Sequence, residues 1–230
     1  MTWLLQKIKS GNWDTEISFN VNDEEIILLA GRNGAGKTTL LNTIAGLVPI
    51  KSGKLFCNNI DLTAQDELIR IQNGIGIALE GRKVFGRLSV KKNLLLGAYL
   101  IHEKHRIFER LDQTLEIFPQ LKSKLDAYAS TLSGGQQTQL NIGRALMGSP
   151  KLLLLDEPSL GLDPINVNRL INALKMIRDK DKIAIIITEQ RSIFLNEYPD
   201  RILLMSRGLI TYDGPNSDLK NHDLFNKILQ

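Results

Sequence analysis

Short apolar runs recur along this chain and are separated by longer stretches with helical periodicity. The runs cover residues 26–30, 75–79, 152–155 and 183–188. A run without polar alternation is typical of a strand that is buried on both faces, as in a parallel sheet. Because such strands alternate here with helical patterns, we predict an α/β fold whose mainly parallel sheet is covered by helices on both faces.

The beginning of the chain has a different pattern, in which shorter apolar stretches are broken by polar turns. Residues 3–21 predict two strands joined by a polar turn at residues 10–12. A short strand at residues 54–57 runs into two asparagines at positions 58–59, a pair typical of a hairpin turn. Since hairpins join antiparallel strands, we expect an N-terminal antiparallel β subdomain beside the central sheet.

Between residue 84 and about residue 129 the strand-like runs disappear and helical periodicity takes over. One amphipathic pattern covers residues 106–118 and is expected to stop at Pro119, because proline interrupts a helix interior. We therefore predict a single domain that contains a helical insertion. Its predicted parts are a core of residues 1–83 and 146–230 and a helical subdomain of residues 84–145.

Composition and charge limit the protein class. No apolar run approaches the ~18 residues that span a bilayer, and the first residues do not resemble a signal peptide. Cys57 is the single cysteine, so we expect no disulfide framework and a cytoplasmic protein. The net charge of +4 is mild and the basic residues are scattered, so we expect no nucleic-acid partner.

The strongest chemical signal is the motif G-x-x-x-x-G-K-T, which directly follows the apolar run at residues 26–30. Helical periodicity comes next, so the motif has the strand, loop and helix context of a phosphate-binding loop. Its glycines allow successive backbone N–H groups to face phosphate oxygens, and the helix start adds a positive dipole end. Lys37 can reach the β- and γ-phosphates, and the Thr38 hydroxyl can ligate Mg²⁺. The predicted nucleotide-binding residues of this loop are Gly31, Arg32, Asn33, Gly34, Ala35, Gly36, Lys37, Thr38 and Thr39.

Two carboxylates follow another buried run, because residues 152–155 lead directly into Asp156 and Glu157. Ligands bind at the carboxyl ends of the strands in open α/β sheets, so we expect both carboxylates near the phosphate loop. Neighbouring side chains on a strand point in different directions. Asp156 is therefore predicted to hold Mg²⁺ with Thr38, and Glu157 to act as the general base that polarises the attacking water.

A second pair of glycines lies at another predicted helix start. Ser133 is a typical N-cap residue, and Gly134, Gly135 and Gln136 open the helix. Such a helix start binds anions, so the chain carries two phosphate-binding elements. One nucleotide cannot easily use both within one subunit. We therefore expect a dimer, in which the phosphate loop of each subunit faces residues 133–136 of the other.

Together these motifs resemble the ATP-binding-cassette (ABC) ATPases. The matching parts occur in family order: residues 31–38 (Walker A), 132–136 (the signature), 152–157 (Walker B) and 159–163 (the D-loop). The resemblance implies an ATP- and Mg²⁺-dependent ATPase that dimerises with a second ABC ATPase subunit, as a homo- or heterodimer. It also implies transmembrane permease subunits as partners, a peripheral position on the inner face of the cell membrane, and a groove of residues 82–100 that grips a coupling helix.

A finer resemblance and two departures concern single positions. The chain looks like the second ATPase subunit of branched-chain amino-acid importers, a resemblance that favours such a solute and is carried by residues 79–85, 88–90, 93–94, 159–162 and 188–190. Glu80 stands where the family usually has a glutamine that contacts Mg²⁺ and the attacking water, and a carboxylate can still ligate the metal. Gln190 stands at the switch position, which is usually His. It can position the γ-phosphate but cannot carry a proton.

The adenine platform has two interpretations. The family stacks an aromatic residue on the base, and Trp13 is the candidate because an indole face stacks well. Trp13 is equally well explained as a packing residue, because a lone aromatic is often one. Both interpretations stay open at the sequence level.

Other functions remain as alternatives. Exporter motors for lipid or polysaccharide share most of these motifs. A non-transport ABC ATPase that acts on DNA would separate Lys37 and Ser133 by a long coiled coil, and the two are too close here. A metabolic kinase would leave residues 132–136 unexplained. We therefore expect a transporter motor, with the direction of transport and the solute undetermined by the motor's own residues.

Overall fold

The computed structural model of this chain describes residues 1–81, 84–189 and 199–219. The strands are β1 (Trp3–Ser10), β2 (Ile17–Val21), β3 (Ile26–Ala30), β4 (Ile50–Cys57), β5 (Ile60–Asp61), β6 (Ile75–Ala78), β7 (Leu152–Asp156), β8 (Ala184–Glu189), β9 (Arg201–Ser206) and β10 (Leu209–Pro215). The helices are α1 (Lys37–Ala45), α2 (Glu67–Gln72), α3 (Val90–Leu96), α4 (Lys104–Ile117), α5 (Pro119–Lys122), α6 (Gly134–Leu146) and α7 (Pro164–Asp181), with 3₁₀ turns at η1 (Ala129–Thr131) and η3 (Asn216–Leu219). Within the described residues, no helix combines the length and the apolar character needed to cross a bilayer.

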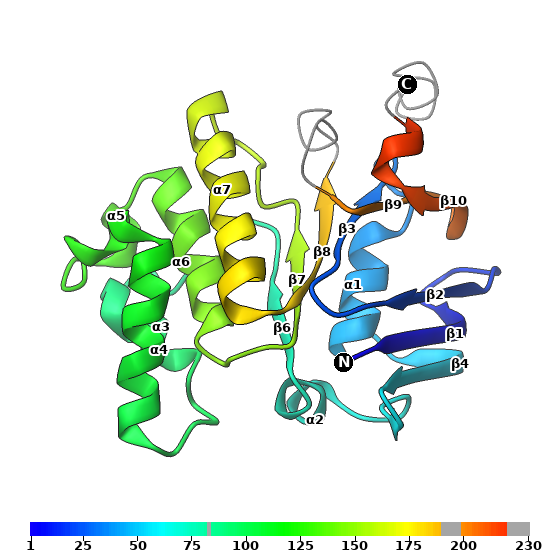
Figure 1. Cartoon of the computed structure of the whole chain (residues 1–230), viewed down its shortest axis with the longest axis horizontal. Coiled ribbons are helices and arrows are strands. Elements are labelled where there is room, and N and C mark those ends of the chain that lie inside the picture. Colours follow the sequence, from blue (N-terminus) through cyan, green and yellow to red (C-terminus); the bar gives the residue numbers. More distant parts are fainter. Residues whose placement is uncertain (82–83, 190–198, 220–230) are drawn as a thin grey trace.

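The central sheet has the strand order β10-β9-β3-β8-β7-β6. The pairs from β9 to β6 are parallel, and the edge strand β10 pairs with β9 in the antiparallel sense. A second sheet, with the order β2-β1-β4-β5, is antiparallel and lies beside the first (Figure 1). The predicted α/β fold, with a mainly parallel sheet and an N-terminal antiparallel sheet, is confirmed.

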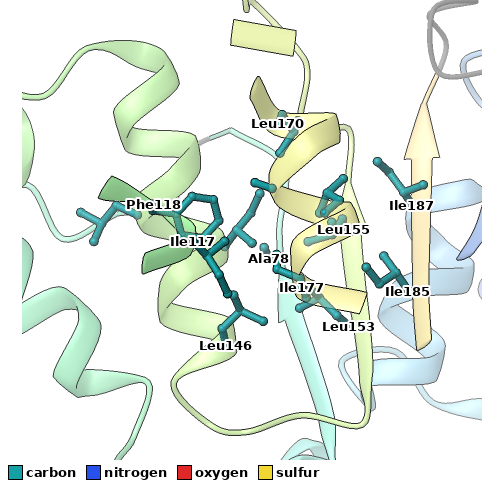
Figure 2. Packing of buried hydrophobic residues seen from close by; sticks show 14 of the residues in the cluster. Ala78, Ile117, Phe118, Leu146, Leu153, Leu155, Leu170, Ile177, Ile185 and Ile187 are labelled. Atoms are coloured by element: carbon teal, nitrogen blue, oxygen red, sulfur yellow. The ribbon is translucent and has the colours of Figure 1, made fainter. Parts of the chain in front are cut away.

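Alternate side chains of the central strands point into two apolar clusters. Leu153, Leu155, Ile185 and Ile187 face the side that α6 and α7 cover (Figure 2). Their neighbours in sequence, such as Leu154, face the cluster that contains α1 and the antiparallel sheet. This alternation follows from the pleat of a strand, which sends successive side chains to opposite faces. As a result α1 and α6 lie on opposite faces of one sheet.

The helices α3 to α6 lie between β6 and β7 in the chain. Leu111 and Leu146 from these helices, and Phe118 between α4 and α5, share one apolar cluster with the sheet residues, and Figure 2 shows Phe118 and Leu146 in this cluster. The helical part therefore packs directly on the sheet. The helix α6 leads through a short connection into β7 and so runs in the opposite direction to that strand. Its first turn therefore lies toward the carboxyl ends of the parallel strands.

Pro119 follows the end of a helix, as predicted, and also opens the next one. The helix α4 ends at Ile117, and Pro119 is the first residue of the short helix α5. Proline suits this position because the N–H it lacks would have no helical partner there and its fixed φ fits a helix start. The predicted stop is therefore confirmed, and the short helix α5 that starts at the proline is an addition that the pattern did not show.

A largely buried ion pair joins α4 to the end of α7. The guanidinium of Arg110 donates to both carboxylate oxygens of Asp181, each at 2.7 Å, and its Nε donates to the Leu146 carbonyl at 2.8 Å. The two charged side chains keep 8% and 13% of their surface exposed. Charge-assisted bonds in this paired geometry are among the stronger polar contacts in proteins. One side chain thus connects α4, α6 and α7.

Candidate nucleotide site

The loop between β3 and α1 has the curled backbone that the glycine motif predicts. Gly31, Gly34 and Gly36 have φ values of 156°, 78° and 106°, a region that favours glycine. A Cβ on Gly31 would lie 2.2 Å from the Met205 carbonyl oxygen, so β9 leaves no room for a side chain there. Gly36 is the N-cap of α1 and supplies no side-chain acceptor to the first turn. The N–H groups of that turn are therefore available for an anion.

The Lys37 ammonium lies inside this loop. Its Nζ donates to the carbonyl oxygens of Gly31 at 2.7 Å and Arg32 at 3.2 Å, and the residue is 5% exposed. The Glu157 carboxylate is 3.8 Å away. A cation held between loop carbonyls and a carboxylate is placed to meet a phosphate that enters the loop.

Asp156 at the end of β7 is joined to two hydroxyls. Its Oδ1 accepts from Thr38 Oγ1 at 3.1 Å and from Thr188 Oγ1 at 2.8 Å. Burial raises the pKa of the Asp156 carboxyl above its usual value, and the Glu157 charge raises it further, while the two hydroxyl bonds and Lys37 act in the opposite direction. The Thr38 hydroxyl and the Asp156 carboxylate thus place two hard oxygen ligands next to each other, and Mg²⁺ prefers ligands of this kind.

Glu157 follows directly and has an unusual backbone. Its φ of 42° lies in the left-handed region, which residues other than glycine, Asn and Asp rarely adopt. Its N–H donates to Thr188 Oγ1 at 2.9 Å. Backbone conformations of this kind persist where the surroundings hold them and are frequent at functional sites.

A cavity of about 950 Å³ brings most of the predicted site residues together. This volume suits a ligand of nucleotide size. The predicted residues that line it are Trp13, Asn33, Gly34, Gly36, Lys37, Thr38, Thr39, Glu80 and Glu157. Asp156 lines an adjoining cavity of about 300 Å³ together with Glu80 and Glu157, and Arg32 and Ala35 border a separate hollow beside β9. The loop that carries Glu80 is held by α6, because Asn141 Nδ2 donates to the Leu79 carbonyl at 3.0 Å.

The second glycine pair lies elsewhere. Ser133 caps α6, since Gln136 N donates to Ser133 Oγ at 3.4 Å and Ser133 N donates to Gln136 Oε1 at 3.1 Å. Gly135 packs against α7, where a Cβ would lie 3.1 Å from Asn166 Cγ. Of the described residues that line the cavity around Lys37, none belongs to residues 133–136. The two predicted phosphate-binding elements therefore stay apart within one chain.

The position of Trp13 is compatible with both interpretations, adenine stacking and core packing. The residue lines the cavity, and its ring also packs against the phosphate loop and the β9–β10 turn. A Cβ on Gly36 would lie 2.7 Å from Trp13 Nε1, and one on Gly208 would lie 2.9 Å from Trp13 Cγ. Stacking on adenine stays a prediction. Gln190, the predicted switch residue, lies outside the described residues.

Three polar residues at the site were predicted only as parts of motifs, Ser159 within the D-loop and Thr188 and Glu189 within the finer resemblance, and none was given a contact of its own. Thr188 and Glu189 end β8, which lies between β3 and β7, and Ser159 lies in the loop after Glu157. Glu189 and Ser159 line the cavity, and Thr188 contacts Asp156. The available signal was the one used for Asp156, namely polar residues at the end of an apolar strand.

Comparisons with known proteins agree with this geometry. The family model described as ABC transporter matches residues 15–160. The chain is 38% identical to the high-affinity branched-chain amino acid transport ATP-binding protein BraG of Pseudomonas aeruginosa over 195 residues, which is 85% of this chain and 83% of the relative. It is 31% identical to the protein named "Probable branched-chain amino acid transport ATP-binding protein LivF" of Archaeoglobus fulgidus over 226 residues, covering 96% of this chain and 95% of the relative.

Solved structures give the same result. A nucleotide-free ATP-binding cassette from an ABC transporter superposes with a TM-score of 0.87 at 26% identity, covering 100% of this chain and 98% of the other. The ADP conformation of another ATP-binding cassette of an ABC transporter gives a TM-score of 0.84 at 26% identity, covering 99% and 98%. Because the family model spans more than half of the chain and both relatives are over 30% identical across more than four fifths of each chain, this chain belongs to the ABC transporter family, as one of its ATPases.

Proposed function

We propose that this ATPase is the motor subunit of a membrane transporter, in which two cassettes close on two Mg²⁺-ATP molecules. The observation that carries the proposal is the separation of the two phosphate-binding elements. The loop around Lys37 shares a cavity with Glu157, whereas Ser133 caps a helix on the opposite face of the sheet. A second subunit that presents residues 133–136 would complete the site in the way that the sequence suggests.

Different residues of this chain bind the phosphates, hold the metal ion and activate the water. The N–H groups of the loop and Lys37 bind the phosphates, and Thr38, Asp156 and Glu80 are the oxygen donors that would hold Mg²⁺. When bound, the metal ion neutralises charge that develops on the phosphate oxygens. Glu157 accepts a proton from the water whose oxygen attacks the γ-phosphorus, and ADP leaves as its bond to that phosphorus breaks. Gln190 would orient the γ-phosphate without taking up a proton.

Two inactive variants test the shared site. Lys37→Ala disables the phosphate loop, and Ser133→Arg disables the other element at an exposed position. In a mixed dimer one site carries both changes and the other carries neither. Equal mixing should therefore restore about a quarter of the wild-type rate, by statistical pairing of subunits. Two variants that stay inactive when mixed, with each shown to fold, would contradict a site shared between subunits.

Glu157→Gln tests the assignment of the base. The amide keeps the size of the side chain but cannot take a proton, so we expect kcat to fall at least about 100-fold, since general base catalysis contributes about 10²–10⁴. ATP affinity, measured by equilibrium titration, should stay within about threefold because the phosphate contacts remain. A Glu157→Gln enzyme with near-normal turnover would overturn the assignment.

An apolar groove supports the proposal of a membrane-embedded partner. It has a volume of about 560 Å³ and lies between the helical part and the sheet. Phe85, Leu96 and Tyr99 line it and are 54%, 44% and 58% exposed, and the Arg144 guanidinium lies 5.1 Å from the centre of the Phe85 ring. Large exposed apolar side chains gathered in one groove are typical of a binding surface. We assign it to a coupling helix of the permease, within the predicted stretch of residues 82–100.

Leu96→Glu tests this assignment, because it should abolish association with membranes that contain the permease while leaving the ATPase rate in solution unchanged. Ile60→Glu is the matched control, since Ile60 is 53% exposed on β5, away from the groove. Equal effects of the two variants would count against the groove.

The names of the BraG and LivF relatives support branched-chain amino acids as the solute, and uptake of labelled leucine by cells that carry Glu157→Gln should be lost.

A further inference from the structure

Glu189 is a buried carboxylate at the edge of the nucleotide cavity. It ends β8 and is 4% exposed. Its Oε1 accepts from the backbone N–H of Ser159 at 2.8 Å, and its Oε2 accepts from Ser159 Oγ at 2.7 Å. Ser159 is 1% exposed. Two short bonds from one buried residue to one carboxylate form a strong and specific link between β8 and the loop after β7.

This link acts beside Glu157. Ser159 follows Glu157 by two positions, and Glu157 has the left-handed φ of 42°. The preceding residue of β8, Thr188, accepts the Glu157 N–H at 2.9 Å. The last two residues of β8 therefore hold the backbone on both sides of an unfavourable conformation. Such a conformation persists only where its surroundings over-determine it.

A carboxylate in a nucleotide cavity could instead take part in the chemistry. For Glu189 the contacts favour a structural task, because each of its oxygens already accepts a hydrogen bond from Ser159. A general base must offer an oxygen to the attacking water. Glu157 is placed to do so, since it lines the same cavity and lies 3.8 Å from Lys37.

We infer that Glu189 is a positioning residue for ATP hydrolysis: its bonds to Ser159 hold the loop that aims Glu157 at the attacking water. The inference rests on the proposed role of Glu157 as base. A misplacement of a reacting group by about 1 Å can cost about 10²-fold in rate, so the link should affect turnover strongly. It should affect ATP affinity little, because the contacts to the phosphates come from the loop around Lys37.

Substitutions at position 189 separate positioning from proton transfer. Glu189→Gln keeps an oxygen for the Ser159 N–H and an NH₂ group for Ser159 Oγ, so kcat should stay within about threefold of wild type. Glu189→Ala removes both bonds, and kcat should fall about 10- to 100-fold while KM for ATP changes less than about threefold. Ser159→Ala keeps the N–H bond and should have a smaller effect. Thermal unfolding shows whether each variant is folded.

Three outcomes would overturn the inference. Glu189→Gln as inactive as Glu157→Gln would mean that the charge at 189 takes part in the chemistry. A folded Glu189→Ala enzyme with full kcat would mean that the link does not matter for turnover. Loss of ATP binding in proportion to kcat would indicate general damage to the cavity. If Glu189→Ala does not fold, the comparison of Glu189→Gln with Glu157→Gln decides, and an active Glu157→Gln refutes the proposed base without reference to position 189.

Discussion

Asp181→Ala should destabilise the protein far more than the loss of an exposed charge does. The substitution leaves the Arg110 guanidinium with its bonds to the Leu146 carbonyl and, at 3.2 Å, to Gln113 Oε1, but without either carboxylate oxygen. An unpaired buried charge of this kind costs about 3–5 kcal/mol. Because the two side chains keep 8% and 13% exposure, water can relieve part of the loss, and we expect a value of about 3 kcal/mol. Such a loss is a large share of the about 5–15 kcal/mol that stabilises a typical domain.

A double-mutant cycle measured by urea unfolding isolates the pair. Arg110→Met should cost about 1 kcal/mol more than Asp181→Ala, because it also breaks the bond to Leu146. The double variant leaves no charge unpaired, so its loss should fall short of the sum by about 2 kcal/mol or more. The exposed pair of Lys180 and Glu116, with 49% and 63% exposure, is the control and should couple far more weakly, because solvent screens it. If Arg110 and Asp181 couple as weakly as this control, the reasoning is refuted.

Three further predictions concern the site. Asp156→Asn should raise the unfolding temperature at neutral pH. Burial raises the pKa of the Asp156 carboxyl in the folded state, so the wild type loses stability as the pH rises from the ordinary to the raised pKa. The difference in unfolding temperature between variant and wild type should therefore vanish at acidic pH. Gly31→Ala should abolish nucleotide binding in a titration, because its Cβ would lie 2.2 Å from a carbonyl oxygen of β9, whereas Gly34→Ala meets no atom within 4 Å and should retain weakened binding. Thr188→Val should lower kcat and leave ATP affinity nearly unchanged, since it removes the contacts to Asp156 and Glu157 at the carboxyl end of β7 but none to the phosphate loop. A fall in affinity instead would show that the loop depends on Thr188.

Local patterns were enough to find the strands that carry the site. The apolar runs at β3, β6, β7 and β8 lie where the sequence predicted them, and glycine chemistry identified the loop after β3. These predictions succeeded because local residue patterns report both features. Burial on both faces of a sheet requires an unbroken apolar run, and a positive φ favours glycine. The stop before Pro119 was predicted correctly, but the helix α5 that begins there was not, because proline suits a helix start as well as the position after a helix end.

The partners of Asp156 required the strand order. Thr188 lies more than thirty positions away in the chain and reaches Asp156 because β8 pairs with β7. Glu189 meets Ser159 for the same reason. No periodicity within one segment reports which strands become neighbours. The strand β4 also starts earlier than predicted, at Ile50, because its first residues pair with β1 across a long stretch of sequence.

The contacts of Lys37 have a consequence for the thermodynamics of nucleotide binding. Its ammonium is held by the Gly31 and Arg32 carbonyls, so the side chain that meets the phosphates is already ordered. Binding would then exchange these bonds for phosphate contacts, with little side-chain entropy to lose. The same exchange makes affinity a difference between two sets of bonds. A ligand without a γ-phosphate offers Lys37 fewer contacts in return, so calorimetry should find that ADP binds with a less favourable enthalpy than ATP.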